Sequence, residues 1–101
     1  MVSKKFFKSK NVCRVTFALP KEIKAETATL VGEFNSWDGT ATPLKKVKGV
    51  WKATLELEEG KEFQYRYLVN GSEWYNDWEA DAYAPNFIDG DNSVVRTYDL
   101  N

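Results

Sequence analysis

The sequence predicts an all-β fold, namely an antiparallel β-sandwich of immunoglobulin-like type with about seven short strands. Apolar and polar residues alternate with a period of two in several segments, which is typical of strands with one buried face. Clusters of turn-forming residues separate these segments at the short intervals found in sandwiches. No helical period persists along the chain for more than one turn. A closed β-barrel is the alternative that this pattern leaves open.

The first two strands are expected at residues 12–19 and 27–34. One face of the first strand carries Cys13, Val15, Phe17 and Leu19. Cys13 therefore points into the core, where burial raises the pKa of a thiol and makes it a packing residue rather than a nucleophile. The second strand is rich in β-branched residues. Gly32 within it indicates either a bulge or a close approach of the backbone to a neighbour.

The middle of the chain is expected to contain a loop and a hairpin. Residues 35–43 are dense in turn formers, so we expect a loop with Trp37 in its middle. A Lys-Gly pair then separates two expected strands, residues 44–47 and 51–57, which form the hairpin. Trp51 alternates with other apolar residues and is expected to face inward.

Residues 62–69 form the next expected strand, with Arg66 on the face that points away from the core. The Asn70-Gly71 pair that follows predicts a type I′ turn, because both central residues of that turn need positive φ. This turn brings Trp74 onto the returning strand.

The two ends of the chain complete the expected organisation. Residues 76–92 form a long polar connection and residues 94–98 the last strand. Residues 1–11 contain four lysines and are expected to form a basic, flexible tail. Residues 12–101 then form a single domain, which is an ordinary length for one hydrophobic core.

The composition excludes several classes of function. The net charge is only −1, from 14 basic and 15 acidic residues, so no global field attracts nucleic acid or an anionic membrane. Charged residues interrupt every apolar run before it reaches the length of a membrane span. The single cysteine and the lack of a secretory signal lead us to expect a cytoplasmic protein.

The residues also argue against catalysis. With no histidine and one cysteine, the chain lacks the side chains for zinc sites, Ser-His-Asp triads and Cys-His dyads. Carboxylates between Glu73 and Asp91 offer many pairs for glycoside hydrolysis, but none stands out, and that reaction also needs a walled cleft. We therefore expect no enzyme activity, no metal and no cofactor.

Aromatic residues provide the positive signal, since they make up 15% of the chain and include four tryptophans. A pyranose presents C–H groups on its faces and hydroxyls around its edge, so an indole covers the face and amide or guanidinium groups bind the edge. Trp37 and Trp74 lie beside turn signals, and Arg66 faces outward nearby. The alternative for each of the two tryptophans is that it folds back and caps the core.

Three motifs occur in order, at residues 32–38 (Gly-Glu-Phe-Asn-Ser-Trp-Asp), 49–51 (Gly-Val-Trp) and 63–74 (Phe-Gln-Tyr-Arg-Tyr-Leu-Val-Asn-Gly-Ser-Glu-Trp). Together they resemble carbohydrate-binding module family 48. That family includes the glycogen-binding domain of the AMP-activated protein kinase β-subunit and the N-terminal domains of isoamylase and glycogen branching enzyme. The resemblance extends over about residues 12–98.

This resemblance implies an early-set immunoglobulin-like sandwich that binds α-1,4-linked glucan. Two tryptophans stack on the sugar in the kinase domain, and they correspond to Trp37 and Trp74. The basic residue of its central strand corresponds to Arg66. An amide near the end of its binding loop corresponds to Asn92, and an apolar residue that inserts into the glucan corresponds to Ile88.

The chain also departs from the kinase domains. Arg66 stands where they carry lysine, and a planar guanidinium approaches a sugar differently from an ammonium group. Residues 76–86 are more similar to the enzyme-linked members, in which the domain packs on a catalytic barrel. The 101 residues contain no such barrel, so we expect a stand-alone module or one that relies on a partner chain.

Two functions follow from the sequence. The first is a non-catalytic module that recognises α-1,4-glucan such as glycogen, starch or maltooligosaccharides. The alternative is a β-sandwich interaction domain that docks on an enzyme of glucan metabolism. Exposure of Trp37 and Trp74 on one surface would favour the first function, and burial or wide separation would favour the second.

Overall fold

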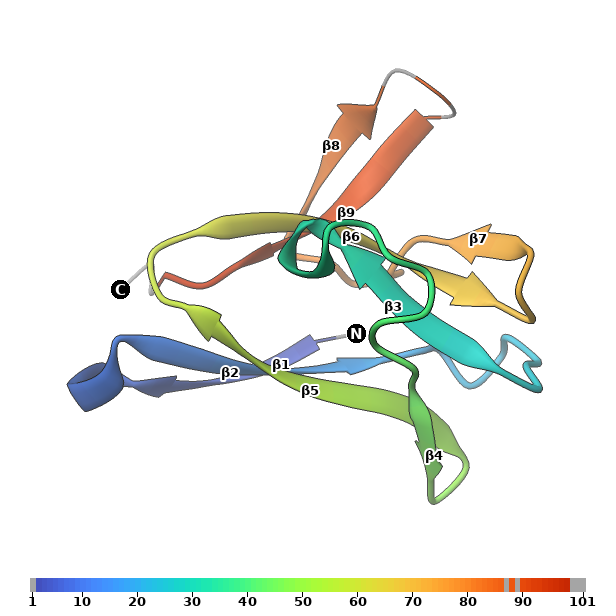
Figure 1. Ribbon diagram of the computed structural model, residues 1–101, viewed down its shortest axis with the longest axis horizontal. Coiled ribbons are helices and arrows are strands. Elements are labelled where there is room, and N and C mark those ends of the chain that lie inside the picture. The colour runs from blue at the N-terminus through green and yellow to red at the C-terminus, as the bar shows by residue number, and fades with distance from the viewer. Residues whose placement is uncertain (1, 87, 89, 99–101) are drawn as a thin grey trace.

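The computed structural model describes residues 2–86, 88 and 90–98, and within them nine strands form two antiparallel sheets (Figure 1). The first sheet has the order β1 (Val2–Phe7), β2 (Val12–Ala18), β5 (Val50–Glu58) and β4 (Lys45–Val47). The second has the order β3 (Ala28–Gly32), β6 (Glu62–Val69), β9 (Gly90–Arg96) and β8 (Ala82–Asn86), and β7 (Glu73–Tyr75) also pairs with β6. The predicted sandwich is confirmed, and the closed barrel is excluded.

One core lies between the two sheets. Phe17 of β2 and Tyr65 and Tyr67 of β6 are fully buried, and the rings of Phe17 and Tyr65 meet edge to face with their centroids 5.0 Å apart. Cys13 is buried as predicted, and burial raises the pKa of its thiol. Trp51 is partly buried and packs against this core, also as predicted. The other buried members are Val15, Leu19, Ile23, Ala28, Leu30, Leu44, Leu57, Val69 and Val95.

The expectation of a flexible tail is wrong for residues 2–7, which form β1 at the edge of the first sheet. Val2 lies opposite Phe17 and Phe6 lies opposite Cys13, and both pack against the core. The lysines dominated the sequence pattern, but lysine is common on edge strands because its charge stays in water. A 3-10 turn, η1 (Lys8–Lys10), then leads into β2.

The expectation of a long polar connection at residues 76–92 is also wrong in part, because β8 and the start of β9 lie within this range. The alternation in β8 is weak, because Ala82 and Ala84 are small, and Tyr83 and Pro85, which alternate with them, are the more exposed residues. A proline is tolerated there because β8 is an edge strand. The last strand therefore runs over Gly90–Arg96 rather than residues 94–98. The outer ends of β8 and β9 project beyond the two layers (Figure 1).

Helical structure is restricted, in the part of the chain that the structure describes, to η1 and a second 3-10 turn, η2 (Glu33–Asn35). The strand expected over residues 27–34 thus ends at Gly32, and η2 begins at the next residue, Glu33. None of the described helices has the length and apolar character needed to cross a bilayer.

Asp77, in the segment between β7 and β8, is a buried polar residue with 1% of its surface exposed. Its Oδ2 accepts hydrogen bonds from the hydroxyls of Tyr65 and Tyr67, each over 3.0 Å. The Asp77 N–H donates to Ser93 Oγ over 2.8 Å, and the Glu79 N–H donates to Asp77 Oδ1 over 3.0 Å. These bonds join the segment to β6 and β9. Burial, together with the charge of Asp77, holds the pKa of Tyr67 well above its usual range, so its hydroxyl remains a donor.

Asp77→Ala is expected to lower the free energy of unfolding by roughly 2–4 kcal/mol, because the buried Tyr65 hydroxyl loses its acceptor and the Tyr67 hydroxyl keeps only the longer bond to the Ala18 carbonyl, over 3.3 Å. Tyr67→Phe should cost about 1 kcal/mol, since Tyr65 still satisfies the carboxyl group. Tyr98→Phe is the matched control, because its hydroxyl binds Glu62 at an exposed position. Urea unfolding at neutral pH measures all three values, and an Asp77→Ala protein as stable as the control would contradict the role of Asp77.

Candidate functional site

Trp37 follows η2, and the local backbone fixes its position. Ser36 and Trp37 both have φ 58°, a left-handed conformation that is costly for a bulky residue and needs support from its surroundings. The support comes from Asn35, whose Oδ1 accepts from the Gly32 N–H over 3.1 Å and whose Nδ2 donates to the Leu30 carbonyl over 3.0 Å. The Trp37 N–H donates to the Gly32 carbonyl over 2.8 Å. Its indole is 41% exposed.

Two glycines allow this loop to lie close to β6. A Cβ added at Gly32 would lie 2.6 Å from the Gln64 carbonyl oxygen, so the close approach predicted from the sequence is confirmed. A Cβ at Gly39 would lie 3.3 Å from Leu68 Cδ2. Val31 pairs with Arg66 and is fully buried although it lies outside the main core. The loop therefore covers one side of the outward face of the second sheet.

Trp74 lies on β7, which pairs with the second half of β6. The turn between them has positive φ at both Asn70 and Gly71, as predicted, and the Ser72 N–H donates to the Val69 carbonyl over 3.2 Å. Trp74 lies opposite Leu68 in the register and is 48% exposed. The second predicted indole is thus on the same face of the sheet as Trp37.

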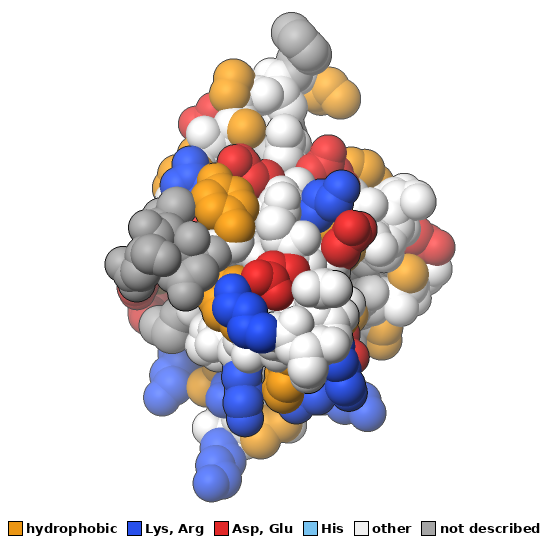
Figure 2. Space-filling model, turned by 90° about the vertical axis from the view of Figure 1, so that its left-hand side faces the viewer, with side chains coloured by type: hydrophobic (Ala, Val, Ile, Leu, Met, Phe, Trp, Pro, Cys, Tyr) orange, Lys and Arg blue, Asp and Glu red, His pale blue; other side chains and the backbone are white. Residues whose placement is uncertain are grey.

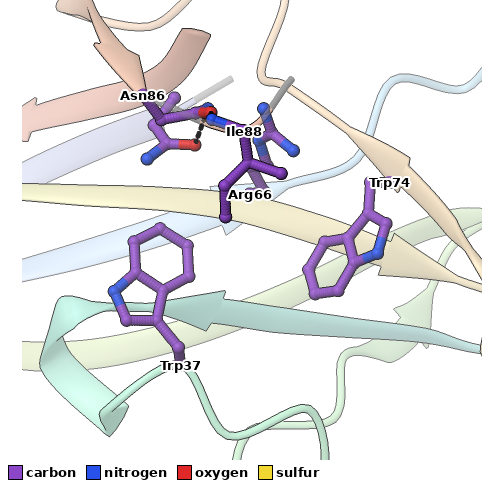
Figure 3. Close-up of a pocket in the computed structure, with 6 residues that line it drawn as sticks. Trp37, Arg66, Trp74, Asn86 and Ile88 are labelled. Carbon is purple, nitrogen blue, oxygen red and sulfur yellow. Dashed lines mark hydrogen bonds between the residues drawn. The ribbon is translucent and has the colours of Figure 1, made fainter. Parts of the chain in front are cut away.

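Arg66 lies on β6 between the two tryptophans and faces outward, as predicted (Figure 3). Its Nη2 donates to the Asp91 carbonyl over 2.7 Å, and Asn76 Nδ2 donates to the same oxygen over 2.8 Å. These contacts connect β6 to the start of β9 and hold the guanidinium group in place.

Asn92 and Ile88 lie on or beside β9. Asn92 is only 8% exposed, and its Nδ2 donates to Gln64 Oε1 over 2.9 Å while its Oδ1 accepts from Asn86 Nδ2 over 3.1 Å. The Ile88 N–H donates to Asn86 Oδ1 over 2.9 Å, and the Ile88 side chain is 93% exposed. Asn92 therefore forms part of the protein's own hydrogen-bond network through both ends of its amide.

The five residues selected from the sequence line one hollow of about 430 Å³, together with Asn86 (Figure 3). Sequence reasoning missed Asn86 because it placed this residue in a connection rather than at the end of a strand. Trp51 and Trp78 do not line the hollow.

The hollow offers mostly apolar and amide groups. Arg66 is the one charged residue among its described lining residues. On the face of the molecule that Figure 2 shows, acidic and basic side chains are mixed, and basic side chains are more frequent toward the bottom of the view. Two exposed indoles with a guanidinium group between them suit a neutral ligand with flat apolar faces and a polar edge.

The comparisons with known proteins agree with this geometry. A family model described as carbohydrate-binding module 48 (isoamylase N-terminal domain) matches residues 14–84, which is more than half of the chain. No curated protein matches the chain.

Asn35→Ala is expected to loosen the loop that carries Trp37, because it removes the hydrogen bonds to Gly32 and Leu30. Amide hydrogen exchange of residues 36–42 should accelerate roughly tenfold, which corresponds to about 1.4 kcal/mol. Asn35→Asp keeps the Oδ1 acceptor for the Gly32 N–H and should give a smaller change. Unaltered exchange in the Asn35→Ala protein would show that other contacts hold the loop.

Proposed function

Because the chain belongs to carbohydrate-binding module family 48, a family of non-catalytic carbohydrate-binding modules, we propose that it binds α-1,4-linked glucan such as glycogen, starch or maltooligosaccharides. The observation that carries this proposal is the meeting of Trp37, Trp74 and Arg66 around one hollow. The proposal also includes a glucan-metabolising enzyme as partner and a cytoplasmic location.

Each residue has a distinct part in the proposed complex. The indoles of Trp37 and Trp74 stack on the C–H faces of glucose units, where apolar area is removed from water. Arg66, between them, donates to hydroxyls at the sugar edge. Ile88 contacts the ring edge from the hairpin between β8 and β9.

Asn92 is proposed as a hydrogen-bonding residue with a second, positioning part. Its amide binds Asn86, which in turn accepts from the Ile88 N–H. Asn92 thus supports the hairpin that brings Ile88 to the hollow, in addition to its proposed hydrogen bond with a sugar hydroxyl.

The exposure of the tryptophans supports glucan binding over the docking alternative. Burial or wide separation of the two indoles would favour docking. Both indoles are instead exposed and line the same hollow. The affinity should still be modest. Two stacks at about 1–3 kcal/mol each, taking the scale for bases on aromatic rings, correspond to a Kd of roughly tens of millimolar to tens of micromolar.

Calorimetric titration with maltoheptaose tests the proposal. The unaltered protein should bind saturably, and Trp37→Ala and Trp74→Ala should each raise Kd roughly 5- to 150-fold, since each removes about 1–3 kcal/mol of stacking. Val47→Ala is the control, because Val47 is exposed on β4 outside the hollow. Cellohexaose, a β-linked glucan, is the ligand control. Absence of saturable binding at several millimolar maltoheptaose would contradict glucan binding and favour the docking domain.

A further inference from the structure

Trp78 is the most exposed of the four tryptophans, at 56%, and the hollow described above does not use it. It lies in the segment between β7 and β8. An indole that is more than half exposed leaves a large apolar area in water, which is unfavourable unless a ligand covers it. The Trp78 indole is therefore accessible to a ligand.

The backbone on both sides of Trp78 is held in place. Asp77 is buried before it, bound to Tyr65, Tyr67 and Ser93. The Glu79 N–H after it donates to Asp77 Oδ1, and the Tyr83 hydroxyl donates to the Asp77 carbonyl over 2.6 Å. A ligand that binds Trp78 thus has little backbone to order, which lowers the entropic cost of binding.

Trp78 lines a second hollow, of about 340 Å³, which shares no residue with the first. Its apolar wall comes from the end of β2, the residues that follow it and the start of β5, and consists of Ala18, Leu19, Pro20 and Val50. Its charged lining residues are two lysines, two glutamates and the buried Asp77: Lys21, Lys52, Glu22, Glu79 and Asp77.

The rim chemistry selects the class of ligand. Two ammonium groups lie beside three carboxylates, and one of these, that of Asp77, accepts hydrogen bonds from Tyr65 and Tyr67. The lining therefore has no large excess of either charge and does not favour a polyanion or a polycation. Ammonium groups donate and carboxylates accept hydrogen bonds, and sugar hydroxyls do both. An indole beside such groups offers the same combination of flat apolar face and polar edge as the first hollow.

We propose that the Trp78 hollow is a second sugar-binding subsite, which holds another stretch of the glucan chain. The identity of the sugar rests on the proposed function, whereas the site itself rests on separate residues. A long polysaccharide that reaches both hollows gains avidity, because the second contact becomes intramolecular, whereas a short oligosaccharide does not.

Amide chemical-shift mapping with maltoheptaose tests the subsite in the Trp37→Ala/Trp74→Ala protein, in which the first hollow is disabled. Amides of residues 18, 19, 21, 22, 50–52 and 77–79 should shift saturably, and adding Trp78→Ala should abolish these shifts. In the otherwise unaltered protein, Trp78→Ala should weaken binding to glycogen roughly tenfold and change maltoheptaose binding at Trp37 and Trp74 less than twofold. Trp78→Phe, which keeps an aromatic face, should retain most glycogen binding, and Val47→Ala should retain all of it.

The outcomes separate the two proposals. No shift of the residues around Trp78 at several millimolar maltoheptaose, or a Trp78→Ala protein with unchanged affinity for glycogen, overturns the subsite. When the same mapping is done on the unaltered protein, shifts around Trp78 without any at Trp37, Arg66 and Trp74 would support the subsite and refute the assignment of the first hollow. Circular dichroism of each variant confirms that it is folded before the shifts are compared.

Discussion

A buried carboxyl group, that of Asp77, joins the segment between β7 and β8 to the central strand of the second sheet. An interior position for this group is costly without polar partners, and the hydroxyls of Tyr65 and Tyr67 and the Glu79 N–H provide them. Because β6 pairs with β3, β7 and β9, the same contacts fix the surroundings of both hollows. The strands on either side of the segment carry Trp74 and Asn86, and the segment itself carries Trp78.

The alternation of β6 explains how one strand serves both stability and binding. Tyr65 and Tyr67 point inward to the core, whereas Arg66 points outward between Trp37 and Trp74. The loop that carries Trp37 is held by Asn35 in a conformation that a tryptophan rarely adopts. Both indoles are therefore placed before any ligand arrives, which lowers the entropy lost on binding. This preorganised pair of exposed indoles is the basis of the glucan recognition that we propose.

Much of the fold could be predicted from the sequence, because the period of two and the turn residues are local signals. Strand β1 could not, because its lysines are compatible with either a tail or an edge strand and only pairing with β2 decides between them. Trp37 and Trp74 were selected by their nearness to turns, but tertiary contacts decide whether a loop tryptophan covers the core or faces solvent. Ile88 and Asn92 came only from the family resemblance, and the role of Asn86 depends on side-chain contacts that no pattern encodes.

The most direct test of glucan recognition is a set of isotope-filtered nuclear Overhauser spectra of the labelled protein with unlabelled maltoheptaose. We predict intermolecular contacts between sugar C–H protons and the indole protons of both Trp37 and Trp74, because stacking places these groups against each other. Saturable binding without a contact to either indole would contradict the account, since the sugar would then lie elsewhere on the molecule.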